Sequence, residues 1–224
     1  RQRQMCIRDS LLVKLGDGQL VESVLLLPDR TPGLCVSTQV GCAVGCRFCM
    51  TGTTGLIRQL GSAEIVAQVA LARTRRPVKK VVFMGMGEPA HNLDNVMEAI
   101  ELLGTAGNIG HKNLVFSTVG DARVFEELPK GAVKPALALS LHTTKADLRR
   151  ELLPRAPQLS PEELVEAGEA YARATGYPIQ YNTTEGMPYV RPSWEKAADI
   201  ARREAPTASA AHRADPAGGL SKLA

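Results

Sequence analysis

The sequence is poor in aromatic residues and has no long apolar run. Aromatic side chains make up 4% of the 224 residues, which is too few to indicate a surface where nucleic-acid bases stack. No apolar stretch approaches the length that crosses a bilayer, and the polar segment Arg1 to Ser10 does not resemble a signal peptide. We therefore expect a cytoplasmic protein without a membrane partner.

Neither sign of charge dominates the chain. The 27 lysine and arginine residues exceed the 23 aspartate and glutamate residues and give a net charge of +4. This balance permits an RNA partner without arguing for one. We expect the clustered basic residues to be solvated faces rather than RNA contacts. They are Arg73, Arg75, Arg76, Lys79, Lys80, Arg149 and Arg150.

Cysteine is scarce too, yet three of the five cysteines lie together. Cys42, Cys46 and Cys49 have the spacing C-x3-C-x2-C, and clustered cysteines in a reducing compartment are typical of metal ligands. Three thiolates do not complete a tetrahedral zinc site. They can hold three irons of a [4Fe–4S] cluster and leave the fourth iron open. A zinc or purely structural site is the alternative interpretation.

Hydrophobic patterns predict a β-hairpin over 11–27, followed by alternating strands and helices. We expect strands over 34–40, 79–85, 113–118, 136–141 and 178–181. We expect helices over 62–75, 92–104, 122–128, from about 144, over 160–176 and over 193–203. Such alternation indicates a parallel sheet with right-handed crossovers. About five strands are too few for a closed eight-stranded barrel. The predicted fold is therefore α/β, an open partial β/α barrel with an N-terminal β-hairpin.

Unusual polar segments follow four of these strands. They are the cysteine loop, Gly85-Met86-Gly87-Glu88-Pro89, Ser117-Thr118 and Ser140-Leu141-His142. In parallel α/β proteins the functional site lies at the carboxyl ends of the strands. The sequence therefore predicts one site at this edge of the sheet.

With these segments identified, the chain resembles the radical S-adenosylmethionine (SAM) adenine carbon-2 RNA methyltransferases, the RlmN/Cfr family. The resemblance spans roughly residues 11–181. It is most specific over 35–50, 84–89 and 139–142. It implies that Cys42, Cys46 and Cys49 bind a [4Fe–4S] cluster whose open iron chelates SAM. It also implies SAM contacts from Gly87, Glu88, Ser117, Ser140, Leu141, His142 and Asn182, and catalytic roles for Glu22 and Cys35.

The chemistry implied by this resemblance uses two SAM molecules. One methylates a cysteine near the C-terminus, and the reduced cluster cleaves the other to a 5′-deoxyadenosyl radical. The implied substrate is adenine carbon 2 of 23S rRNA, with tRNA as a second candidate. A monomer served by an electron donor such as flavodoxin or ferredoxin is expected.

The sequence also departs from the family pattern. No cysteine follows Cys49, so the methyl-carrying cysteine is missing, and Tyr181 and Asn182 resemble two family segments joined directly. We interpret residues 1–10 as an unrelated leader, 11–33 as a hairpin extension and 34–204 as a partial barrel that is incomplete after 181. Residues 205–224 are expected to lack order. The chain thus looks truncated, internally deleted and unable to complete methylation.

Other interpretations remain for single residues and for the whole chain. Glu88 can simply cap the next helix, Cys35 can be a buried structural thiol, and Glu22 can be a solvated strand carboxylate. His142 can be a strand-end histidine with satisfied hydrogen bonds. The chain as a whole can be a non-catalytic cluster- and SAM-binding fragment, or a radical SAM enzyme with a different substrate.

Overall fold

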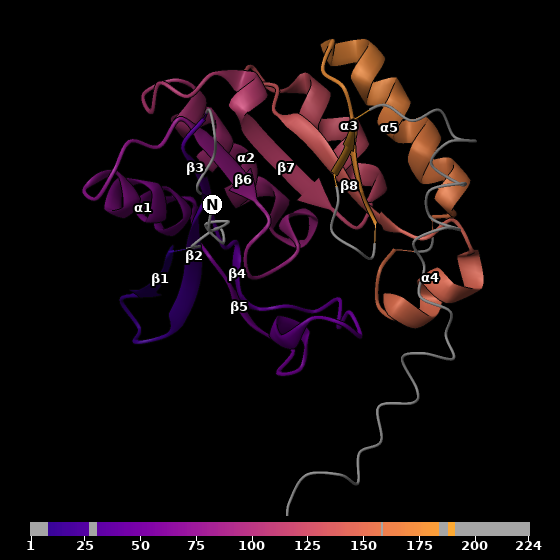
Figure 1. The fold of residues 1–224 in the computed structure, drawn as a ribbon, viewed down its shortest axis with the longest axis horizontal. Coiled ribbons are helices and arrows are strands. Elements are labelled where there is room, and N and C mark those ends of the chain that lie inside the picture. The colour runs from indigo at the N-terminus through magenta and orange to yellow at the C-terminus, as the bar shows by residue number, and fades with distance from the viewer. Residues whose placement is uncertain (1–8, 27–30, 158, 184–187, 191–224) are drawn as a thin grey trace, which may run out of the picture.

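An eight-stranded sheet forms the centre of the molecule (Figure 1). The structure is a computed structural model that describes residues 9–26, 31–157, 159–183 and 188–190. The strands in spatial order are β1 (Asp9–Lys14), β2 (Leu20–Leu26), β3 (Gly33–Cys35), β6 (Lys80–Phe83), β7 (Leu114–Thr118), β8 (Ala136–His142), β9 (Gln180–Thr183) and β10 (Pro188–Val190). Strands β3, β6, β7, β8 and β9 run parallel to one another, whereas β1 pairs antiparallel with β2, β2 with β3 and β10 with β9. The predicted α/β fold with an N-terminal hairpin is confirmed.

The helices connect the parallel strands. They are α1 (Ser62–Arg73), α2 (Leu93–Gly104), α3 (Ala122–Glu127), α4 (Ala146–Leu152) and α5 (Pro161–Thr175). Short 3₁₀ turns η1 (Met50–Gly52), η2 (Pro89–Asn92), η3 (His111–Asn113) and η4 (Leu128–Lys130) lie between them. Helix α5 begins as its sequence predicts: the Ser160 hydroxyl accepts from the Glu163 amide at 3.2 Å, and the Glu163 carboxylate accepts from the Ser160 amide at 2.7 Å. Gly176, with φ of 76°, ends it.

Apolar side chains of the central strands pack on both faces of the sheet. Phe83, Phe116 and Leu139 are buried in the main core with residues of α1, α2 and α5. Val82 and Val115, which alternate with them, pack in a separate cluster on the opposite face. This two-sided burial explains why the strands are nearly continuous apolar runs.

The single strand predicted over 34–40 is wrong. The chain leaves β3 at Cys35, and β4 (Gln39–Gly41) pairs with β5 (Leu56–Gln59) in a second, two-stranded sheet. The cause is the buried side chain of Gln68, whose Oε1 accepts from the Ser37 amide and whose Nε2 donates to the Ser37 carbonyl, both at 2.9 Å. Because a side chain takes both backbone groups of Ser37, no neighbouring strand can pair there.

Smaller differences concern element ends. Strand β1 begins at Asp9, which pairs with Leu25, so the hairpin includes the end of the predicted leader. Helix α1 is capped at Gly61 rather than at Ser62, because the Glu64 carboxylate accepts from the Gly61 amide at 3.0 Å. The predicted helix over 193–203 and the tail 205–224 lie outside the described residues. Among the helices the structure describes, none is long and apolar enough to cross a membrane.

Candidate cofactor site

The cysteine loop is the connection between β4 and β5, and a close backbone contact closes its base. The Cys42 amide donates to the Gly55 carbonyl at 2.9 Å. Gly41 has φ of 77°, and a Cβ on it would lie 2.0 Å from that carbonyl oxygen. Only glycine fits this position. Within the loop, the Cys49 amide donates to the Cys46 carbonyl at 3.0 Å, so a short turn brings the last two cysteines near each other.

A cavity of about 290 Å³ gathers nearly all of the predicted cofactor residues. Its walls come from the cysteine loop and from the carboxyl ends of β6, β7, β8 and β9. The predicted residues that line it are Cys42, Cys46, Cys49, Gly87, Glu88, Ser117, Ser140, His142 and Asn182. Leu141 does not line it, because its side chain is buried in the main core. The polar segments predicted to follow the strands therefore line a single cavity.

Two of the three thiols, those of Cys42 and Cys46, resist losing their protons in the folded protein. Burial, and then the negative charges of Cys42 and Cys49, raise the pKa of Cys46 to about 12, and burial raises the pKa of Cys42 as well. In the described part of the chain, no three His, Cys, Asp or Glu side chains converge as ligands of one metal ion do. The thiolates of a cube each bind a different iron. Three separate cysteine thiols that line one cavity are the ligand type and number that a [4Fe–4S] cluster with one open iron takes.

Glu88 combines a structural contact with a place on the cavity wall. Its Oε1 accepts from the Ala90 amide at 3.1 Å and so caps η2, and its Oε2 accepts from the Val119 amide at 3.0 Å. The capping interpretation is confirmed by this geometry. The residue is 5% exposed, and burial raises its pKa to about 7. A ligand cation beside it would favour the charged carboxylate.

Gly87 lets the backbone pass close to the second small sheet. Its φ is 100°, and a Cβ on it would lie 2.5 Å from the Cβ of Gln39 on β4. The Gln39 Oε1 in turn accepts from the Glu88 amide at 2.8 Å. Gln39 thus fixes the Gly87–Glu88 turn against the base of the cysteine loop. Sequence reasoning missed this residue, since a lone glutamine in a predicted strand gives no signal.

The ends of β7 and β8 complete the wall. The hydroxyl oxygens of Ser117 and Ser140 lie 3.5 Å apart. His142 has φ of 61°, and the pairing of β8 with β9 shifts register between Ser140 and His142. The Phe48 ring of the cysteine loop lies 4.7 Å from the His142 ring, centroid to centroid. Strained backbone of this kind is concentrated at functional sites.

A second cavity, of about 420 Å³, holds the other two predicted residues, Glu22 and Cys35. It shares Cys49, Thr51, Met84 and Gly85 with the first cavity, so the two adjoin. The Ser37 hydroxyl donates to the Glu22 carbonyl at 2.6 Å and accepts from the Met86 amide at 2.9 Å. This link ties the hairpin to the Gly-rich turn.

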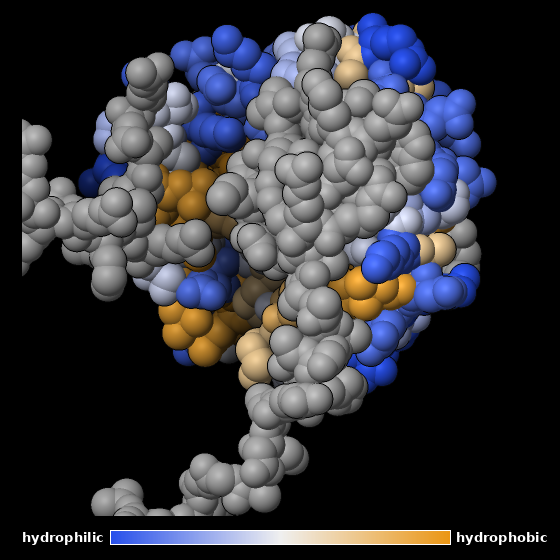
Figure 2. Space-filling view, turned by 45° about the vertical axis from the view of Figure 1, so that its right-hand side comes forward, coloured by the Kyte–Doolittle hydropathy of each residue, from blue (hydrophilic) through white to orange (hydrophobic). Residues whose placement is uncertain are grey.

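Apolar side chains are exposed at the cavities. Phe48 and Met84 line the first cavity and are 53% and 40% exposed. On the face shown in Figure 2, separate apolar areas lie open among hydrophilic residues. Such surface around a cavity is typical of a binding site for a ligand or partner.

One of the basic residues is buried, although the sequence predicts a solvated side chain. Arg149 was predicted to be solvated, but it is 4% exposed, whereas its neighbour Arg150 is exposed as predicted. Arg149 and the buried Leu153, which caps the end of α4, are four positions apart, so the helical period places both on the same side. That spacing was the signal that could have identified it.

The comparisons with known proteins concern most of this region. Residues 36–203 match the family model described as the radical SAM superfamily. A probable RNA methyltransferase of Azoarcus sp. (strain BH72) is 80% identical over 174 residues, which cover 78% of this chain and 49% of that protein. One of Leptothrix cholodnii is 66% identical over 226 residues, covering 86% of this chain and 64% of that protein.

A solved structure is similar as well. A radical SAM methyltransferase from Sphaerobacter thermophilus has a TM-score of 0.72 and 35% identity, and the match covers 78% of this chain and 53% of that one. The chain therefore spans about half to two thirds of the length of these relatives.

Proposed function

This chain belongs to the radical SAM superfamily, and we propose that it is the cofactor-binding part of an RNA methyltransferase. The proposed target is carbon 2 of adenine in 23S rRNA, with tRNA as a second candidate substrate. The main support is the cavity that brings the three cysteines together with Glu88 and the strand-end serines. The names of the curated relatives, probable RNA methyltransferases, support the reaction class.

In this proposal Cys42, Cys46 and Cys49, which line the cavity, would hold a [4Fe–4S] cluster. When bound, the cluster supplies the electron that cleaves SAM to a 5′-deoxyadenosyl radical. Gly87 offers its backbone to SAM, and Glu88 offers a buried carboxylate to the ammonium of the methionine moiety. Low dielectric around Glu88 strengthens that contact.

The proposed SAM wall continues along the strand ends. Ser117 and Ser140 present hydroxyl groups, and His142 and Asn182 line the same cavity, whereas Leu141 is buried in the main core and does not line it. These groups suit the hydroxyl and nitrogen atoms of an adenosyl moiety, which need hydrogen-bond partners once they leave water.

Glu22 and Cys35 are proposed to act on the RNA base from the adjoining cavity. That cavity is bordered by the apolar side chains of Val24, Leu26 and Val82, and it meets the first cavity at Cys49. A flat base entering it would leave water and lie beside Cys49, which borders both cavities. The arrangement supports a substrate side and a cofactor side that share one wall.

A second candidate, a non-catalytic cluster- and SAM-binding fragment, is favoured by two observations on this chain. No cysteine follows Cys49, so residues 1–224 supply no late methyl-carrying thiol. The alignment with the Leptothrix protein has 226 positions but includes only 86% of these 224 residues, so that relative carries a segment this chain lacks. We propose that residues 1–224 by themselves bind the cofactors and do not complete methylation.

Anaerobic reconstitution with iron and sulfide tests the cofactor part. We expect a brown protein that binds SAM, with SAM binding weakened in Glu88→Ala and unchanged in the exposed variant Glu151→Gln. A colourless protein after reconstitution would refute the proposal.

Mass spectrometry of rRNA adenines tests the reaction. Cells that lack the gene should lose the carbon-2 methyl group of an adenine in 23S rRNA, and an intact reading frame should restore it. Complementation with residues 1–224 alone should not. If deletion leaves every rRNA and tRNA adenine unchanged, the enzyme acts on a different substrate.

A further inference from the structure

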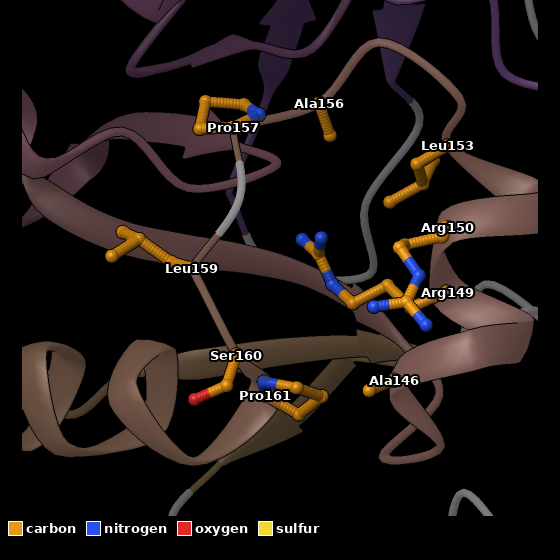
Figure 3. A pocket seen from close by; sticks show the side chains of 9 residues that line it. All are labelled: Ala146, Arg149, Arg150, Leu153, Ala156, Pro157, Leu159, Ser160 and Pro161. Carbon is orange, nitrogen blue, oxygen red and sulfur yellow. The ribbon is translucent and has the colours of Figure 1, made fainter.

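The buried guanidinium of Arg149 has no role in the site described so far. Its side chain extends from α4 into a cavity lined by Leu153, Ala156, Pro157 and others (Figure 3). The residue is 4% exposed. Burial lowers its pKa to about 10, which leaves it positively charged at neutral pH. Burying a charge is costly unless a compensating group lies nearby.

The hydrogen bonds of Arg149 lead directly to the cofactor cavity. One terminal nitrogen donates to the Val119 carbonyl. The Val119 amide donates to the Glu88 carboxylate at 3.0 Å. Among the described residues, Nε of Arg149 has no hydrogen-bond partner and the guanidinium forms no ion pair. Within the part of the chain that the structure describes, this buried cation therefore has no direct counter-ion.

The negatively charged groups that interact with Arg149 belong to the cofactor site. The charge of Arg149 interacts with the charges of Cys46 and Glu88. Glu88 is a poor counter-ion on its own, because burial holds its pKa at about 7 and its oxygens already accept two backbone amides. The three cysteines of the loop are thus the groups whose negative charge best compensates the positive charge of Arg149.

Helix α4 is held firmly against the cysteine loop. The Arg47 amide, next to Cys46, donates to the Leu152 carbonyl at 2.9 Å. Leu153 and Ala156 pack with Cys42, Val44 and Val119 in one apolar cluster, which Cys46 and Leu152 border. The helix therefore fixes the position of the guanidinium relative to the thiols.

We propose that Arg149 is a positioning residue whose buried positive charge stabilises the reduced state of the iron–sulfur cluster and so raises its reduction potential. The inference rests on the proposed function, since it requires the cluster. Reduction adds one electron, taken from an external low-potential donor, and hence one negative charge to a group that three thiolates already make anionic. A nearby buried cation favours that added charge.

The test is a redox titration of the reconstituted chain with titanium(III) citrate, followed by electron paramagnetic resonance of the reduced cluster. Arg149→Met and Arg149→Gln remove the charge, and the glutamine keeps a donor for the Val119 carbonyl. We expect both to lower the ratio of reduced to oxidised cluster at a fixed potential at least tenfold, equal to a 59 mV shift for one electron. Arg149→Lys, which keeps the charge, should shift less. The control Arg150→Met removes an exposed charge on the same helix and should leave the potential unchanged.

The outcomes separate this inference from the proposed function. A wild-type chain that assembles no cluster refutes the proposed function and the inference with it. A wild-type potential in either neutral variant overturns the inference alone, even if the variant unfolds at a lower temperature. If neither neutral variant retains a cluster, the lysine variant decides. If Arg149→Lys retains the cluster and circular dichroism is unchanged in all variants, the positive charge is needed. If all three variants lose the cluster, Arg149 has a structural role.

Discussion

Glu88 makes the stability of the cofactor-free protein depend on pH in an unusual direction. A buried carboxyl that keeps its proton more tightly when folded contributes stability at low pH and loses it as pH rises. The pKa of Glu88 is raised by burial from the ordinary 4.5 to about 7. The contribution is therefore fully present below about pH 4.5 and declines until about pH 7.

The magnitude follows from the size of that shift. Each pKa unit is worth 1.36 kcal/mol, so the free energy of unfolding should fall by about 3 kcal/mol across this window. Glu88→Gln removes the titration, although its amide nitrogen now faces one of the two backbone N–H groups that the carboxylate accepts. That mismatch should cost about 1–3 kcal/mol at every pH. Because the wild type loses about 3 kcal/mol over the same window, the mutant should be less stable at pH 4.5 and equally or more stable by pH 8.

Urea unfolding of the full chain without iron, from pH 4.5 to 8, measures the effect. The difference in unfolding free energy between wild type and Glu88→Gln should shrink steadily as pH rises. His91, whose pKa is lowered by burial, is common to both proteins, so its titration cancels in the difference. Glu151→Gln, which changes an exposed carboxyl on α4, should show the wild-type pH dependence. A difference that stays constant between pH 4.5 and 8 would mean that Glu88 is ionised in the folded protein.

Three further changes test the site and its support. Cys46→Ala should abolish the iron–sulfur absorbance after anaerobic reconstitution, whereas Cys35→Ala, in the adjoining cavity, should keep it. Gly87→Ala should destabilise the fold by about 1–3 kcal/mol and weaken SAM binding in calorimetry, because its φ is 100° and its Cβ would meet a glutamine side chain at 2.5 Å; Gly61→Ala, with open space around it, should not. Gln68→Leu should cost about 2–4 kcal/mol in urea unfolding, because it leaves the buried groups of two serines without partners; a loss below about 1 kcal/mol would refute the role assigned to that side chain.

Local patterns predicted much of the fold because they act over short distances. The capping box of Ser160 and Glu163 and the Gly176 end of α5 appear where the sequence places them. The apolar runs became the parallel strands because a sheet covered on both faces requires them. The prediction of one strand over 34–40 was wrong because the backbone of Ser37 is hydrogen-bonded to the side chain of Gln68. Gln68 belongs to the next helix, and no local pattern connects it to Ser37.

By itself, the sequence determined which chemical groups are available to a site. They are three thiols at C-x3-C-x2-C spacing and polar segments at the ends of apolar runs. Residue type and spacing decide which ligands are available, so they can be inferred without coordinates. Only the tertiary structure decided which of these groups share a cavity, that Leu141 turns into the core, and that Arg149 is buried beside the cysteine loop. Burial and proximity arise between segments far apart in the chain, and they set the charges that the site can hold.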